Sequence, residues 1–141
     1  MNTEMFNDFP WLQTIVAALA YFMLGALWYS KVLFSKKWIG YLKIDVNDPN
    51  AKKGMGLMFG GSLVMMFLQS FALAILVTRL DLDGHWMSGL KLGLLTGICF
   101  CSASIATNYF YEKKPLGLFL INGGYTIAGN IIAAVILCSW R

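Results

Sequence analysis

Charge is what this sequence has least of. Of its 141 residues, 13% are charged and 58% are hydrophobic, whereas a soluble domain has about a quarter charged residues and just under half apolar ones. A chain with so little polar surface cannot cover itself in water. The composition therefore excludes an ordinary soluble domain and favours a chain whose solvent is the hydrocarbon of a bilayer.

The residue types that carry most enzyme and cofactor chemistry are also scarce. His85 is the only histidine, so a haem would lack axial ligands, and no nucleophile, base and orienting group occur together. The cysteines Cys99, Cys101 and Cys138 lie in apolar segments, and a C-x-C spacing on a helix directs its two thiols about 200° apart. We therefore expect free thiols, no metal or other cofactor, and no enzyme activity.

Four long stretches with almost no charge make up most of the chain. Each has the roughly 20 apolar residues that a helix needs to cross a hydrocarbon core about 30 Å thick, and a helix satisfies its own backbone groups in lipid. The predicted spans are residues 11–30, 55–78, 86–111 and 116–138. The sequence thus predicts an all-α fold, a four-helix transmembrane bundle that forms one integral membrane domain over residues 1–141.

The basic residues lie on one side of these spans. Eight of the eleven lysines and arginines fall in the loop of residues 31–54 or in the link between the third and fourth spans. Because positive residues in short loops stay in the cytoplasm, we expect both connections inside the cell and both termini on the outer, periplasmic side of a bacterial inner membrane. The net charge of +4 then reflects topology and contact with anionic lipid, and no nucleic-acid partner is expected.

Aromatic residues mark the cytoplasmic end of the first span. Trp28 and Tyr29 are expected at the membrane interface, where such rings keep a polar atom near water. In the loop that follows, Phe34 and Trp38 fall on the apolar side of a helical wheel, opposite lysines. Residues 31–44 therefore predict an amphipathic helix on the membrane surface, with an irregular loop as the alternative.

A row of glycines in the third span indicates close helix packing. Gly89, Gly93 and Gly97 recur at four-residue spacing, the small-xxx-small pattern by which membrane helices approach one another. The partner is either another helix of the same chain, for which the similarly spaced glycines of the second span are candidates, or a helix of a second subunit.

Amide and hydroxyl side chains inside the apolar spans need partners there. They are Gln69, Asn108, Asn122, Tyr125, Thr126 and Asn130. Because the third and fourth spans are joined by a short link, they must be antiparallel neighbours, and Asn108 and Asn122 are expected to bond to each other. The set predicts interhelical hydrogen bonds, worth about 0.6 kcal/mol each in membranes, or alternatively a polar path for a solute.

Lys91 is the one ionisable residue within the predicted spans. An intramembrane charge is by default a functional candidate. Lys91, however, lies roughly 8 Å from the outer end of its span at 1.5 Å per residue. Its side chain can extend to the outer surface, toward Asp81 or Asp83, or it can serve an anion or a gate.

Two segments resemble a known family. They are GALWYSKVLFSKKW, residues 25–38, and INGGY, residues 121–125. Both are similar to the pattern of an uncharacterised family of small bacterial four-span integral membrane proteins, catalogued as a domain of unknown function. The matching positions are Gly25, Trp28, Tyr29, Ser30, Leu33, Phe34, Trp38, Ile121, Asn122, Gly124 and Tyr125. Where the family has a small residue and proline after W-Y-S, this chain has Lys31 and Val32. The resemblance implies the topology and no particular activity.

These observations lead to three functional hypotheses. The first is a non-enzymatic multi-pass inner-membrane protein, a homo-oligomer whose packed helices serve assembly or contact lipid. The second is a small oligomeric channel or transporter with a solute path lined by the amides. The third is a lipid- or quinone-binding subunit of a membrane complex that uses the aromatic inner loop.

Overall fold

The computed structural model describes every residue of the chain except 1–2, 46, 51–52, 83 and 141. Its described residues form helices and connections and no strand, which confirms the predicted all-α fold. In chain order the elements are η1 (Thr3–Phe6), α1 (Trp11–Trp28), α2 (Ser35–Leu42), α3 (Met55–Arg79), α4 (Trp86–Leu95), η2 (Thr96–Ser102), α5 (Ala103–Glu112) and α6 (Leu116–Ser139).

Four helices are long and apolar enough to cross a membrane: α1, α3, α6 and the continuous run of α4, η2 and α5. They begin at the residues where the four spans were expected to begin. Local chemistry explains their ends. Pro115, whose missing N–H needs no partner at a helix start, caps α6, and Lys113, in the left-handed conformation at φ 54°, ends α5 and reverses the chain.

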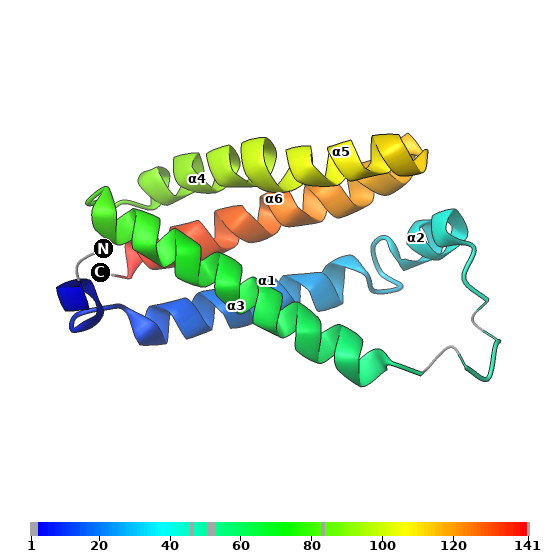
Figure 1. Ribbon diagram of the computed structural model, residues 1–141, viewed down its shortest axis with the longest axis horizontal. Coiled ribbons are helices and arrows are strands. Elements are labelled where there is room, and N and C mark those ends of the chain that lie inside the picture. Colours follow the sequence, from blue (N-terminus) through cyan, green and yellow to red (C-terminus); the bar gives the residue numbers. More distant parts are fainter. Residues whose placement is uncertain (1–2, 46, 51–52, 83, 141) are drawn as a thin grey trace.

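The helices form two antiparallel hairpins (Figure 1). α4 and its continuation lie along α6, α1 packs against α6 and α3, and α3 crosses α1 and also contacts α6. Both termini lie at one end, called here the terminal end. The connection from α1 to α3, with α2, and the link at Lys113 lie at the opposite end, called here the lysine end. The two lysine-bearing connections therefore lie together.

The glycine row of the third span packs α4 against α6. A Cβ atom added to Gly89 would lie 2.6 Å from the Cα of Val135, and one on Gly93 would meet the α6 backbone at Ile131. The pairing considered with the second span is wrong, because Gly56 and Gly60 have no such neighbour within 4 Å. The glycine row therefore brings the backbones of α4 and α6, two helices of the same chain, into contact.

The π-helical segment η2 changes which face the third span presents to α6. A π turn holds one more residue than an α turn, so the inward row passes from Gly97 to Ser102 and then to Tyr109. Ser102 is 4% exposed and its hydroxyl donates to the carbonyl oxygen of Gly123 on α6, whereas Asn108 is exposed. The expected bond between Asn108 and Asn122 is wrong, because the α-helical period from which it was inferred does not hold through η2.

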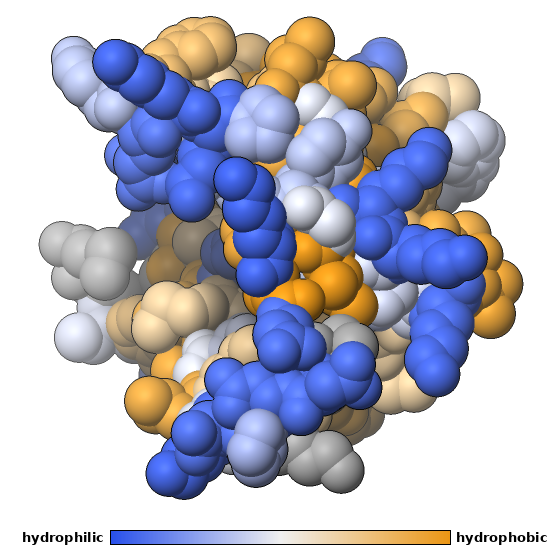
Figure 2. Space-filling model, turned by 90° about the vertical axis from the view of Figure 1, so that its right-hand side faces the viewer, coloured by the Kyte–Doolittle hydropathy of each residue, from blue (hydrophilic) through white to orange (hydrophobic). Residues whose placement is uncertain are grey.

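The segment after the first span forms the helix α2, not an irregular loop. Its apolar side rests on the end of α1: the ring centroids of Trp28 and Phe34 are 5.0 Å apart, and those of Tyr29 and Trp38 are 5.3 Å apart. Lys36 and Lys37 are exposed. Figure 2, which looks at the lysine end, shows hydrophilic side chains around more hydrophobic ones.

Candidate functional site: a cavity at the lysine end

A cavity of about 900 Å³ lies between the helices in the half of the bundle nearer the lysine end. It exists because α3 leans away from α5 there (Figure 1) and has no packed interface with it. None of the α3 residues before Ser70 is buried. The lining residues are Phe22, Gly25, Ala26 and Tyr29 from the α1 region, Trp38 from α2, Met58, Phe59, Ser62 and Met66 from α3, Ile105 and Tyr109 from α5, and Asn122, Tyr125 and Thr126 from α6.

The cavity wall is apolar, aromatic and uncharged. No aspartate, glutamate, lysine, arginine or histidine is among the described residues that line it. Its volume falls within the roughly 300–1,000 Å³ of small-molecule sites, which are typically apolar pockets with a few convergent polar groups. The wall can thus accept an apolar molecule with a small polar function, and it offers no counter-ion to a charged one.

The polar groups of the wall converge on Asn122. Its side-chain oxygen accepts a hydrogen bond of 2.6 Å from the hydroxyl of Tyr29, and its NH₂ donates one of 2.5 Å to the hydroxyl oxygen of Tyr109. The amide therefore joins the end of α1 to α5 through α6. This three-residue chain, Tyr29–Asn122–Tyr109, is called the amide bridge below.

The two segments that resemble the family pattern meet beside this bridge. The indole N–H of Trp28 donates to the carbonyl oxygen of Ile121 at 3.0 Å. A Cβ added to Gly25 would lie 2.8 Å from the hydroxyl of Tyr125, and one on Gly124 would lie 3.2 Å from the Trp28 ring. Trp28 and Tyr29 were expected to keep their polar atoms near water. Both are half-buried and bond instead to α6.

A second polar group lies next to the cavity-lining Thr126, on the side of the terminal end: the NH₂ of Asn130 donates to the carbonyl oxygen of Thr126 at 2.8 Å. Asn130, 2% exposed, accepts a bond of 3.2 Å from the hydroxyl of Thr96 and donates one of 3.4 Å to that of Tyr21. The Tyr21 hydroxyl in turn lies 3.3 Å from Oε1 of Gln69. The mid-span glutamine thus has a partner. This group, Tyr21, Gln69, Thr96 and Asn130, is called the amide plug below.

The remaining predicted polar residues also contact other helices. The hydroxyl of Thr126 lies 3.3 Å from that of Ser102, and the hydroxyl of Tyr125 donates to the carbonyl oxygen of Tyr21 at 3.3 Å. Sequence reasoning missed Tyr21 and Tyr109. A hydroxyl in the middle of the first span could have pointed to Tyr21, but nothing in the period of the third span points to Tyr109.

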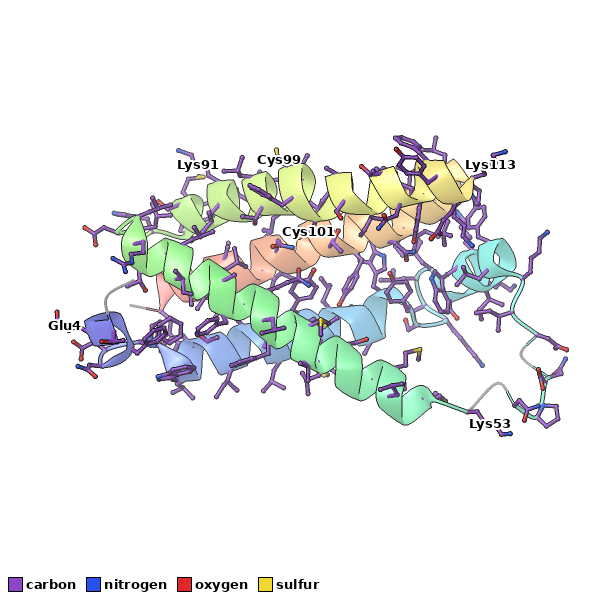
Figure 3. The ribbon with its side chains drawn as sticks, viewed as in Figure 1. Glu4, Lys53, Lys91, Cys99, Cys101 and Lys113 are labelled. Atoms are coloured by element: carbon purple, nitrogen blue, oxygen red, sulfur yellow. The ribbon has the colours of Figure 1, made fainter. Side chains whose placement is uncertain are left out.

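Lys91 and the thiols are not part of the cavity. Lys91 is exposed on α4 and points away from the other helices (Figure 3); Asp83, one of its two expected partners, lies outside the described residues. Cys99 is exposed, Cys101 is half-buried and Cys138 is buried, and none of the three forms a disulfide. Among the described residues no three histidine, cysteine or acidic side chains are grouped so that they could hold a metal ion.

Four apolar helices of membrane-crossing length around an uncharged cavity define an integral membrane protein with a candidate site for a small molecule. The chain belongs to the family described as "Protein of unknown function (DUF1761)", which matches residues 12–138. This match covers most of the chain and confirms the resemblance to a family of unknown function. Neither the curated proteins nor the solved structures include a match to the chain.

Proposed function

We propose that this is a non-enzymatic multi-pass protein of the bacterial inner membrane that binds an amphiphile of the lipid or quinone type in the cavity. The observation that carries the proposal is the uncharged aromatic wall of a partly open cavity of about 900 Å³ in a helix bundle. Binding such a molecule there buries apolar surface of both the cavity wall and the ligand. The third hypothesis from the sequence is thus the one that the geometry favours.

The way into the cavity supports a lipid-soluble ligand. α3 and α5 line opposite walls and have no packed interface with each other, so a molecule can enter from the bilayer between them. The cavity-lining residues Met58 and Phe59 are exposed on α3, so the same apolar surface continues from the outside to the inside. The cavity is formed within one chain and needs no second copy.

A solute path through a single chain is disfavoured by the packing beyond the cavity. Tyr21, Ala17 and Ala133 are at most 1% exposed, and Asn130 is 2% exposed. A hydrated ion or solute would have to open the amide plug and then separate helices that touch through alanine and glycine. The cavity therefore functions better as a one-sided binding site than as part of a channel.

The orientation that we propose places the lysine end in the cytoplasm and both termini in the periplasm. The support is that the two lysine-bearing connections lie together at one end and that positive residues are retained inside. Reporter fusions to each terminus test it. A reporter that is active only in the periplasm should work at both ends, and one that is active in the cytosol at either end contradicts the proposal.

Filling the cavity tests the binding function. Ser62→Phe places a ring into the cavity from α3, and Val64→Phe adds the same ring to the exposed outer side of that helix, where Val64 is 53% exposed. After purification in a mild detergent, organic extraction and mass spectrometry should find a bound amphiphile with the wild type and with Val64→Phe, and far less with Ser62→Phe. Equal amounts in the two variants, or none in the wild type, contradict the proposal.

A further inference from the structure

We infer that the ligand of this cavity is uncharged and presents an acceptor oxygen of the carbonyl type to the hydroxyl of Tyr109. This inference rests on the proposed binding function and specifies its chemistry. It follows from counting where each hydroxyl hydrogen in the cavity wall is used, since a donor that lines a cavity and has no acceptor in the protein can bond to an acceptor on a ligand.

Three of the five hydroxyls in the wall donate to main-chain carbonyl oxygens. Ser62 donates to Met58 at 2.6 Å, Thr126 to Gly123 at 2.9 Å, and Tyr125 to Tyr21 at 3.3 Å. Their hydrogens are therefore used inside the protein. The two that remain, Tyr29 and Tyr109, belong to the amide bridge.

The amide bridge cannot satisfy both tyrosines. An asparagine side chain has one oxygen that accepts and one nitrogen that only donates. The oxygen of Asn122 is used by the hydroxyl of Tyr29, and Tyr109 receives a hydrogen from the nitrogen. The hydroxyl hydrogen of Tyr109 is thus left without an acceptor among the described residues, next to the cavity that Tyr109 lines. The second hydrogen of the Asn122 NH₂ also has no acceptor in the part of the chain that the structure describes.

These two donors determine what the ligand must offer. The site presents hydrogens and no charge, so it suits a neutral oxygen with lone pairs. A phosphate or carboxylate would be buried without a counter-ion, which is far more costly than burying a neutral polar group. The aromatic wall fits a flat ring or an acyl chain beside that oxygen. A quinone ring and the ester of a neutral glyceride share this chemistry, and an anionic phospholipid does not.

The test measures binding to the full-length protein in detergent by isothermal titration calorimetry with four probes. Decylubiquinone and dioctanoylglycerol supply carbonyl oxygens, dioctanoyl phosphatidic acid supplies a charge, and decylbenzene supplies a ring and chain with no acceptor oxygen. We expect at least one carbonyl probe to bind and the acid to bind at least tenfold more weakly. The carbonyl probe that binds more tightly shows whether the ligand is of the quinone or of the glyceride type. Binding of either probe supports the inference.

Tyr109→Phe removes the donor and keeps the ring. For one neutral hydrogen bond we expect affinity for the carbonyl probe to fall by about 2- to 10-fold, while the affinity for decylbenzene stays the same. The unchanged decylbenzene value shows that the variant is folded. Tyr111→Phe is the matched control, since Tyr111 is 85% exposed on the same helix, and it should bind every probe like the wild type.

The outcomes separate this inference from the proposed function. If Tyr109→Phe binds the carbonyl probe like the wild type while Ser62→Phe does not bind it, the cavity is a binding site and the inferred role of Tyr109 is overturned. Equal or tighter binding of phosphatidic acid overturns the inferred neutrality. If no probe binds the wild type and Ser62→Phe retains the same extracted compounds as the wild type, both the inference and the proposed function fail.

Discussion

The two ends of the bundle are packed by opposite means. Toward the terminal end, alanine and glycine let helices touch through their backbones: Ala17, Ala74, Ala133 and Ala134 are 0% exposed. Toward the lysine end, tyrosine and tryptophan side chains fill the space between the helices, and α5 has no buried residue. Small residues make a closed seam, and large aromatic ones hold the helices apart around a cavity.

This difference divides the bundle along its length into a closely packed half and an open half. The terminal half is held together by close backbone contact, which gains dispersion energy along the whole interface. The lysine half can then leave apolar surface unpacked on α3 without losing the fold. The amide plug lies between the closely packed half and the half that contains the cavity. Its hydrogen bonds set the register of the helices there.

The largest expected effect is at the closed seam. Gly93→Leu puts a side chain where the α6 backbone lies, and the backbone cannot move aside as a flexible side chain can. We expect at least about 3 kcal/mol of lost stability, the upper range for overpacking, seen as a large drop in the yield of monodisperse protein and in its unfolding temperature in detergent.

Gly60→Leu is the matched change at the open end. A Cβ there meets nothing within 4 Å apart from the helix's own backbone, and leucine favours a helix more than glycine does. The unfolding temperature should stay the same or rise slightly. Equal losses in the two variants would show that the ends are not packed differently.

Deleting Cys99 tests the π turn that divides the third span. Removing one residue should convert η2 to regular α-helix, and Ser102 then follows Gly97 by four residues and still faces α6. We expect stability and the extracted amphiphile to stay close to the wild type. Deleting Ala106 instead, in the regular helix beyond the π turn, should rotate the rest of α5 by about 100° and break the bond between Asn122 and Tyr109. A polar group left without its partner costs about 1–3 kcal/mol, and the extracted amphiphile should be lost. Equal losses in the two deletion variants would argue against this account of the register.

A smaller effect is expected at the amide bridge. Tyr29→Phe removes the hydroxyl that bonds to Asn122 at 2.6 Å and keeps the ring contact with Trp38. We expect a loss of about 0.5–1.5 kcal/mol, the usual net value of one hydrogen bond, measured by thermal unfolding in detergent. The exposed Tyr111→Phe should lose nothing, and an equal loss there would mean that the bridge does not stabilise the lysine end.

The last prediction concerns the amide plug, where we expect no labelling by a water-soluble thiol reagent. In a background without the three native cysteines, Asn130→Cys should not react with a membrane-impermeant thiol reagent from either side, because Asn130 is 2% exposed. A cysteine at the exposed loop residue Lys53 should react and serves as the positive control. Labelling at position 130 would reveal a water path and favour the channel hypothesis.

Particular residues show how much of the structure could be predicted from the sequence. The helix starts at Trp11, Met55, Trp86 and Leu116 were predictable because apolar length and the proline before the last helix are local properties. The need of Gln69 for a partner was predictable too, since an amide in an apolar span must be satisfied. The bond from Asn122 to Tyr109 was not, because it depends on one extra residue in the turn at η2.

The sequence by itself determined that four apolar helices form, where they begin and end, and that both lysine-bearing connections lie at one end, because hydrophobic length and charge act along the chain. Only the tertiary structure decided that the glycine row packs on α6, that Trp28 and Tyr29 turn inward, and that α3 leaves a cavity beside Tyr109. These features depend on which surfaces fit together across the bundle, and residues far apart in the chain set that fit jointly.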